Sequence, residues 1–236
     1  MYLSRLTLAR KPEVEALGPI LSPAHDGRRM DAHHRLIWSA FAGDPEACRD
    51  FLWRDMGRGQ FMVLSPRPPA ASALFEQPEV KPFQPELAPG DRLAFVLRAN
   101  ATRTVKTDHI TPSGKRERQH NDVVMEALKS VPRRRDLPPN EESHRARQRL
   151  EIAQKAGADW MAGQGARAGF RLLDCHVSAY DVRDLPGQGK RRPRFGVLDL
   201  EGVLEVTDPS ALVARLCQGF GRAKAFGCGL MLIRRA

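Results

Sequence analysis

The sequence predicts an α+β protein made of two ferredoxin-like units in tandem, each with the element order βαββαβ. In the second half, four apolar segments and two segments of helical periodicity follow one another in this order. The first half begins with the same succession, and the proline-rich stretch KPFQPELAPG at residues 81–90 separates the two. We therefore expect an N-terminal unit at residues 1–89 and a C-terminal unit at residues 90–236.

The elements of the first half are predicted from short periodic segments. Alternating apolar residues in MYLSRLTLAR predict a strand at the start, and a connector containing Pro and Gly follows to about Arg29. DAHHRLIWSAF, residues 31–41, has the apolar spacing of a short amphipathic helix. FLWRDMGRGQFMVLSP predicts a hairpin that turns at Gly57 and Gly59. A weak helical pattern near residues 70–75 is the last element expected before the linker.

The second half shows the pattern more clearly. DRLAFVLRANATR predicts a strand, and residues 121–158 are basic and largely helical, with breaks at Pro132 and at Pro138-Pro139. FRLLDCHVSAYDVR and RFGVLDLEGVLEV predict two strands, joined by the charged turn DLPGQGKRRP. Asp208 and Pro209 predict the N-cap and first residue of a helix, and residues 230–233 a buried final strand.

The composition favours a polyanionic partner. Lys and Arg outnumber Asp and Glu by 38 to 28 in 236 residues, a formal net charge of +10. Such an excess is typical of proteins that bind a phosphate backbone, although a merely basic soluble protein is the alternative. Cys48, Cys175, Cys217 and Cys228 form no CxxC pair and have no histidine nearby, so we expect buried thiols without a disulfide framework or a metal site.

The same sequence lacks the features of a secreted or membrane protein. No apolar run approaches the roughly 18 residues of a membrane span. The N-terminus alternates in polarity, where a signal peptide would have a continuous apolar core. We therefore expect a cytoplasmic protein that works in a reducing compartment and does not contact the membrane.

Near its end the chain has a glycine-rich loop, GFGRAKAFGCG, with glycines at 219, 221, 227 and 229. A nucleotide phosphate loop runs from a strand through glycines into a helix, whereas here the helix comes first. The spacing fails as well, because Lys224 stands where GxGxxG needs its third glycine. The sequence thus predicts no small-molecule cofactor.

Two interpretations of the glycine-rich loop remain. A helix C-cap followed by a tight turn explains one or two glycines. Alternatively, the loop lies against a polyanion, with bare backbone allowing close approach while Arg222 and Lys224 meet phosphates. Four glycines are more than a cap needs, which favours the second interpretation.

Several motifs taken together resemble the CasE family, the CRISPR-repeat endoribonucleases of type I-E systems. They are MYLSRLTL, HRLIW, KPFQPELAPGDRLAFVLRAN and LEGVLEVTDP leading to the glycine-rich loop, in the family's order over nearly the whole chain. The chain departs from the family at Ala101, where relatives have proline, and at Asp31, where some have tyrosine.

The resemblance implies a tandem ferredoxin-like fold and metal-independent cleavage of CRISPR precursor RNA within each repeat hairpin. In that reaction the 2′-OH attacks the neighbouring phosphorus, leaving a 2′,3′-cyclic phosphate and a 5′-OH. The resemblance also implies that the enzyme stays bound to the mature crRNA alongside the other subunits of the Cascade surveillance complex. A non-catalytic RNA-binding scaffold of the same fold is the alternative.

Cleavage of this kind needs a group that exchanges protons near neutral pH and cations that stabilise the phosphorane. Histidine meets the first need. The family match assigns the catalytic role to His34, as general base or general acid, with Arg35 as a possible phosphate contact. On the predicted helix His34 lies away from the Ile37–Phe41 stripe, and His33 is the second choice.

The predicted RNA-binding residues lie in three places. A basic hairpin suits the phosphates of an A-form stem, whose narrow major groove hides the bases, although a solvated turn is the alternative. Only 2 Tyr and 3 Trp occur, so stacking of bases on the sheet is not expected to be the main mode of binding. The residues are Arg183, Lys190, Arg191 and Arg192 in the hairpin, Arg98, Arg103 and Lys106 along a second track, and Gly219, Gly221, Arg222, Lys224, Gly227 and Gly229 in the glycine-rich loop.

Overall fold

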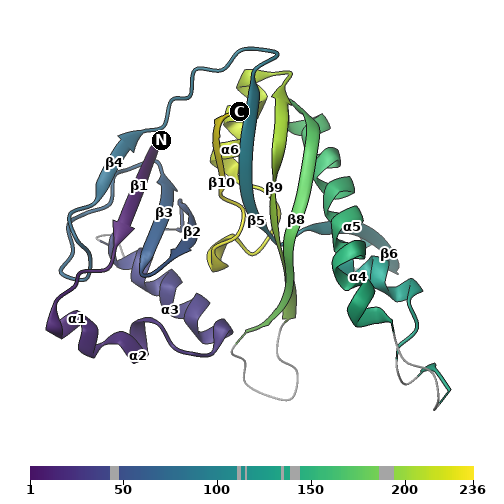
Figure 1. The fold of residues 1–236 in the computed structure, drawn as a ribbon, viewed down its shortest axis with the longest axis horizontal. Helices are drawn as coiled ribbons and strands as arrows, with labels where there is room; N and C mark the ends of the chain where they lie inside the picture. The colour runs from purple at the N-terminus through teal and green to yellow at the C-terminus, as the bar shows by residue number, and fades with distance from the viewer. Residues whose placement is uncertain (43–47, 111–112, 115, 134–135, 139–143, 186–193) are drawn as a thin grey trace.

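The computed structural model contains two four-stranded antiparallel sheets that stand side by side, with helices packed against each (Figure 1). It describes residues 1–42, 48–110, 113–114, 116–133, 136–138, 144–185 and 194–236. Both sheets have the strand order of a ferredoxin-like unit, in which the first and third strands are central. The predicted tandem α+β fold is confirmed.

The first sheet has the order β2-β3-β1-β4. Its strands are β1 (Tyr2–Thr7), β2 (Leu52–Gly57), β3 (Gln60–Ser65) and β4 (Glu79–Pro82). The helix α3 (Asp26–Ser39) contributes Leu36 and Ile37 to the core beneath this sheet. The predicted hairpin is present, because Gly57, Arg58 and Gly59 all have the positive φ angles that close its turn.

Two expectations for the first half are wrong in detail. The helix starts at Asp26, five residues before the expected start, and the connector contains the short helices α1 (Pro12–Ala16) and α2 (Gly18–Leu21). No helix forms near residues 70–75. Leu74 and Phe75 belong to an irregular segment that packs on the first core. They are apolar because they are buried, and not because they lie on one face of a helix.

The second sheet has the order β10-β5-β9-β8. Its strands are β5 (Arg92–Ala99), β8 (Phe170–Asp184), β9 (Arg194–Val206) and β10 (Met231–Arg235). The helices α5 (Arg145–Ala168) and α6 (Pro209–Gln218) pack against one face of this sheet. Asp208 caps α6 as predicted, since its Oδ1 atom accepts a hydrogen bond from the amide of Ala211 at 3.0 Å.

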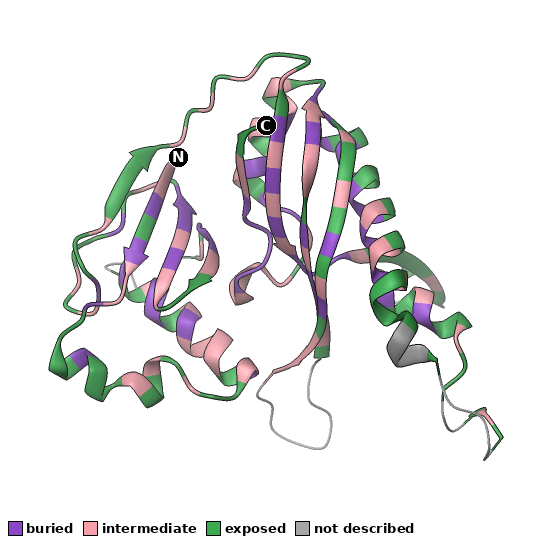
Figure 2. Cartoon of the chain, viewed as in Figure 1, coloured by how far each residue is buried: buried purple, intermediate pink, exposed green. Residues whose placement is uncertain are grey.

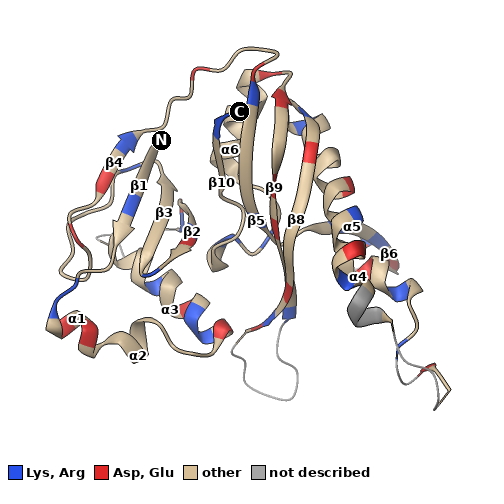
Figure 3. Ribbon diagram, viewed as in Figure 1, with Lys and Arg blue, Asp and Glu red and all other residues tan. Residues whose placement is uncertain are grey.

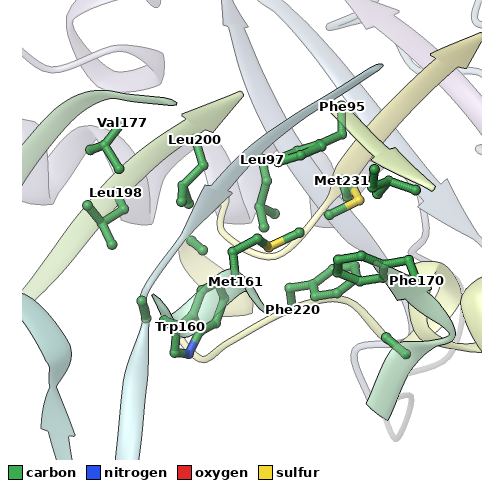
Figure 4. Packing of buried hydrophobic residues seen from close by; sticks show 14 of the residues in the cluster. Phe95, Leu97, Trp160, Met161, Phe170, Val177, Leu198, Leu200, Phe220 and Met231 are labelled. Atoms are coloured by element: carbon green, nitrogen blue, oxygen red, sulfur yellow. The ribbon is translucent and has the colours of Figure 1, made fainter. Parts of the chain in front are cut away.

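The largest hydrophobic core lies between this sheet and its helices (Figure 4). Met161 of α5 extends toward Leu97 of β5, and both side chains are fully buried. Phe170 and Phe220 meet edge to face at 6.3 Å. Buried residues are concentrated on the strands of the two sheets and on the helix faces that meet them (Figure 2).

A two-stranded ribbon interrupts the second unit between β5 and α5. The single strand expected at residues 91–103 is divided between two, because β5 ends at Ala99 and a new strand, β6 (Thr102–Ile110), begins outside the sheet. It pairs with β7 (Arg116–Asp122) to form the ribbon. The ribbon lies beyond α5, on the side away from the first sheet (Figure 1). Its side chains are mostly exposed and polar, so the sequence has no apolar alternation from which to predict it.

The predicted helical region at residues 121–158 is present only in part. It begins with α4 (Val123–Ala127) and a 3-10 turn, η1 (Leu128–Ser130), and it resumes with α5 at Arg145. The four cysteines are free, but the expectation that they are buried is wrong for three of them: only Cys228 is buried, whereas Cys175 and Cys217 are partly exposed and Cys48 is exposed. Within the described ranges, no helix is both long and apolar enough to cross a membrane. The proposed division at residues 89 and 90 stays a prediction; β4 ends at Pro82 and β5 begins at Arg92.

Leu97 tests whether the second core determines stability. We expect Leu97→Ala to lower the free energy of unfolding by about 2–5 kcal/mol, because the removed atoms leave a cavity in a closely packed core. Leu150→Ala is the matched control, since Leu150 is 51% exposed whereas Leu97 is 0% exposed. The control should change stability by no more than about 0.5 kcal/mol. Urea unfolding followed by circular dichroism measures both, and equal losses would contradict the assignment of the core.

Candidate nucleic-acid interface

The glycine-rich loop, residues 219–229, lies between the two units. It leads from α6 toward β10 and contains the 3-10 turn η3 (Lys224–Phe226). The indole Nε1 atom of Trp53 in β2 donates a hydrogen bond to the carbonyl oxygen of Ala225 at 3.2 Å. Gly227 packs on the same indole ring, where a Cβ atom would lie 3.1 Å from the ring carbons. The loop is therefore fixed against the first unit.

Internal packing explains why these positions are glycine. All four have positive φ, between 71° and 94°. A Cβ atom at Gly219 would lie 2.8 Å from the Leu52 side chain, and one at Gly221 would lie 2.5 Å from the carbonyl oxygen of Asn100. Three of the four glycines are buried. The cap-and-turn interpretation thus accounts for more glycines than expected, and RNA contact at the glycines themselves stays a prediction.

Polar contacts across the interface also hold the units together. Asp199 of β9 accepts two hydrogen bonds from Arg98, at 2.9 and 2.8 Å, and lies 3.7 Å from Arg54 of β2. Arg183 of β8 forms an ion pair with Asp26 of α3. Asp26, Arg98, Arg183 and Asp199 line a small cavity of about 70 Å³ between the units. Arg98 and Arg183, both predicted to bind RNA, are thus engaged in ion pairs within the protein.

The two histidines of α3 face different surroundings. His33 is buried, 6% exposed, and its Nδ1 atom lies 3.3 Å from a carboxylate oxygen of Asp55. His34 is half-buried beside Trp38 and Phe51, with ring centroids 6.2 Å from each. The Nε2 atom of His34 is buried and has no hydrogen-bond partner among the described residues. Of the two, His34 therefore has a ring nitrogen that is not already engaged.

The environment of His34 favours its neutral form. Burial lowers its pKa below the ordinary value of 6.5, and the positive charge of Arg49 lowers the pKa further. The carboxylate of Asp31 opposes these effects, whereas Arg35 adds a smaller lowering. At neutral pH the imidazole is consequently unprotonated and able to accept a proton.

Arg49 connects His34 to the glycine-rich loop. Burial lowers the pKa of Lys224, and the charges of Arg215 and Arg49 lower it further. Lys224 also donates a hydrogen bond to the carbonyl oxygen of Gln218 at 2.6 Å. The positive charge of Arg49 thus acts on both His34 of α3 and Lys224 of the glycine-rich loop. Sequence reasoning missed Arg49 because a single arginine outside any motif gives no signal.

The other predicted residues are more widely distributed. Arg35 is 79% exposed in its side chain and forms an ion pair with Asp31 at 2.9 Å, on the solvent side of α3. Arg103 and Lys106 are exposed on the ribbon, and Arg222 is exposed in the loop. Lysines and arginines are visible on both α3 and β6 (Figure 3). The hairpin residues Lys190, Arg191 and Arg192 lie outside the described residues. In the described ranges, no three His, Cys, Asp or Glu side chains are placed to hold a metal ion.

Comparison with known proteins places this architecture in a family. A family model described as CRISPR associated protein matches residues 1–235. The chain is 28% identical to the CRISPR system Cascade subunit CasE of Escherichia coli K12 over 98% of both chains. It is 31% identical to the CRISPR-associated endoribonuclease Cse3 of Thermus thermophilus, covering 91% of this chain and 96% of that protein.

A solved structure shares the fold. The structure of Thermus thermophilus Cse3 bound to an RNA representing a pre-cleavage complex superimposes with a TM-score of 0.63 at 22% identity. The match covers 99% of this chain and 98% of the other. The two ferredoxin-like sheets and their relative arrangement therefore recur in that protein.

Removing the charge of Arg49 should change the protonation of His34. We expect Arg49→Gln to raise the pKa of His34 toward 6.5, because a nearby positive charge then no longer disfavours the imidazolium. Arg35→Gln is the matched control and should raise the pKa by less. Titration of the imidazole signals by NMR measures both shifts. An unchanged pKa in Arg49→Gln would show that Arg49 does not act on His34.

Proposed function

This chain belongs to the CRISPR associated protein family, and on that basis we propose that it is a metal-independent endoribonuclease that cleaves CRISPR precursor RNA within each repeat hairpin. The proposal is supported by the name of the Thermus relative, an endoribonuclease, and by the agreement of fold along the whole chain. The Escherichia relative is named as a Cascade subunit. We accordingly propose that this protein also works within such a complex, bound to the mature crRNA.

The observation that carries the proposal is the buried, unpartnered Nε2 atom of His34, on which the positive charge of Arg49 acts. A buried ring nitrogen without a partner is costly unless a ligand completes its hydrogen bonding. The lowered pKa keeps this nitrogen unprotonated, which suits a general base. Among the described histidines, we therefore assign the catalytic role to His34 rather than to His33, whose Nδ1 atom already meets Asp55.

The reaction follows from this assignment. His34 takes the proton of the 2′-OH as the oxygen attacks the adjacent phosphorus. A bond forms between O2′ and phosphorus, the bond from phosphorus to O5′ breaks, and the leaving O5′ takes up a proton from solvent water. The products are a 2′,3′-cyclic phosphate and a 5′-OH end. Lys224 and Arg49 supply positive charge for the phosphorane, where fixed cations in a partly desolvated site stabilise the transition state most strongly.

The contacts between the units hold this arrangement in place. His34 belongs to the first unit and Lys224 to the second, so the catalytic geometry depends on how the glycine-rich loop sits on β2. Misplacement of reacting groups by as little as about 1 Å reduces rates severely. The bond from Trp53 to Ala225 and the contact of Gly227 with the indole ring limit such movement.

His34→Ala tests the catalytic assignment. We expect the single-turnover cleavage rate of a CRISPR repeat transcript to fall about 10²- to 10⁴-fold, the usual contribution of a general base. Affinity for the transcript should change little, because the imidazole is neutral. His176→Ala is the matched control, since His176 is exposed on β8, and its rate should equal that of the wild type. Unchanged cleavage by His34→Ala would remove His34 from the mechanism.

Metal independence and the products have a separate test. We expect the wild-type protein to cleave the transcript at full rate in excess chelator and to leave 2′,3′-cyclic phosphate ends, because the attacking oxygen belongs to the RNA. Resistance of the ends to phosphatase, lost after acid treatment, detects the cyclic phosphate. Loss of cleavage in chelator would contradict the mechanism. Tight binding without cleavage in any buffer would instead support an RNA-binding scaffold.

A further inference from the structure

We infer that Asn100 is a positioning residue for the proposed cleavage, an inference that rests on the proposed function. Asn100 follows the last residue of β5 and is 4% exposed. Its hydrogen bonds join two elements that the sequence predicts to meet the RNA. One is the basic hairpin, whose base is formed by the ends of β8 and β9, and the other is the glycine-rich loop. By joining them, Asn100 sets where the bound RNA stem lies relative to Lys224.

The base of the basic hairpin extends beyond the end of β5. β5 pairs with β9 as far as Ala99, which lies opposite Leu198. β8 and β9 continue past this point as a pair, to Asp184 and Arg194 (Figure 1). Residues 185–193, which include three of the predicted RNA-binding cations, connect these two strand ends in the sequence. Because two strands alone are only marginally stable, the direction of the hairpin depends on contacts at its base.

The side chain of Asn100 provides such a contact. Its Nδ2 atom donates a hydrogen bond to the carbonyl oxygen of Gly196 at 2.8 Å. Gly196 is buried and belongs to the part of β9 that does not pair with β5. A buried carbonyl group needs a donor, and the amide side chain supplies one where the backbone donors of β5 have ended.

Asp122 and Tyr180 also pack against Gly196. A Cβ atom at Gly196 would overlap the carboxylate of Asp122 and the ring of Tyr180. The hydroxyl group of Tyr180 donates a hydrogen bond to Oδ1 of Asp122 at 3.1 Å. The same oxygen accepts hydrogen bonds from the amides of Val124 and Met125 at 3.0 and 2.8 Å. The base of the hairpin is therefore tied to the start of α4 as well as to Asn100.

The backbone of Asn100 holds the glycine-rich loop. Its carbonyl oxygen accepts a hydrogen bond from the amide of Arg222 at 3.1 Å. Gly221 lies against the same oxygen, since a Cβ atom there would be 2.5 Å away. Lys224, which supplies charge to the phosphorane in the proposed mechanism, follows two residues after Arg222. A movement of the hairpin base relative to the loop therefore breaks one of the two hydrogen bonds of Asn100.

The glycine-rich loop is thus held from both units. Trp53 fixes it to the first unit, which carries His34, and Asn100 fixes it to the base of the hairpin. Displacement of reacting groups by about 1 Å lowers rates by about 100-fold. Loss of the Asn100 contact should therefore misplace the scissile phosphate in RNA that is still bound, which lowers the cleavage rate more than the affinity.

The experiment compares Asn100→Leu with Gln154→Leu. Both replace an amide side chain that bonds strand backbone with an apolar one. Gln154 of α5 donates to the carbonyl oxygen of Cys175 at 2.7 Å and accepts from the amide of Val177 at 2.8 Å. These contacts lie where β5 still pairs with β9, away from the hairpin base and the loop. Gln154→Leu is therefore the matched control for a general loss of stability.

We expect Asn100→Leu to lower the single-turnover rate constant for a CRISPR repeat transcript about 10- to 100-fold at saturating protein. Its dissociation constant for the transcript, measured by fluorescence anisotropy, should change by no more than about threefold. Product sizing should show additional cuts beside the normal site. In Gln154→Leu the rate constant and the cut position should equal those of the wild type, because partial unfolding lowers the amount of product formed and not the position of the cut.

Tyr180→Phe is a second, milder variant, because it removes only the hydroxyl group that bonds Asp122. We expect a smaller fall in the rate constant, again with additional cuts.

Equal rate constants and cut positions in Asn100→Leu and Gln154→Leu would overturn the inference. If Asn100→Leu does not fold, Tyr180→Phe decides, and a wild-type rate constant with a single cut in that variant would overturn it. Absence of cleavage by the wild type would instead contradict the proposed function itself.

Discussion

The contact between Trp53 and the glycine-rich loop is the constraint on which the arrangement of the two units depends. The indole ring covers Gly227 and donates a hydrogen bond to the carbonyl oxygen of Ala225, and these contacts hold the loop against β2. Leu52 and Leu64 of the first sheet and Leu230 of the second unit form an apolar cluster alongside it. Because His34 and Lys224 belong to different units, the contacts between Trp53 and the glycine-rich loop set the distance between these two residues.

Most of the fold was predictable from sequence because its elements bury one face. Strands such as β5 and β9 show clear apolar periodicity, and the sequence around Asp208 and Pro209 marks a helix start that the structure confirms. The missed elements bury little or follow no period. The β6–β7 ribbon is exposed nearly throughout, and residues 70–75 fill the first core without regular structure.

The candidate site was predictable only where a motif existed. The histidine was found through its family position, whereas its lowered pKa arises from burial and from Arg49, which no local pattern reports. The same limit applies to the glycines. The sequence shows four glycines in this loop, but it does not show whether their missing side chains make room for a ligand or for a neighbouring side chain. Leu52 and Trp53, which lie in the other unit and far away along the chain, supply the reason for two of them.

Among the residues of the first unit that the structure describes, α3 is the one long helix, where a complete ferredoxin-like unit has two. The first unit's own core is correspondingly small, and the outer face of its sheet is completed by leucines that pack on β10 of the neighbour. Cut away from the second unit, this half would expose Leu52, Leu64 and the Trp53 ring to water. The two halves therefore share part of their folding free energy, and we expect them to unfold together and not as independent domains.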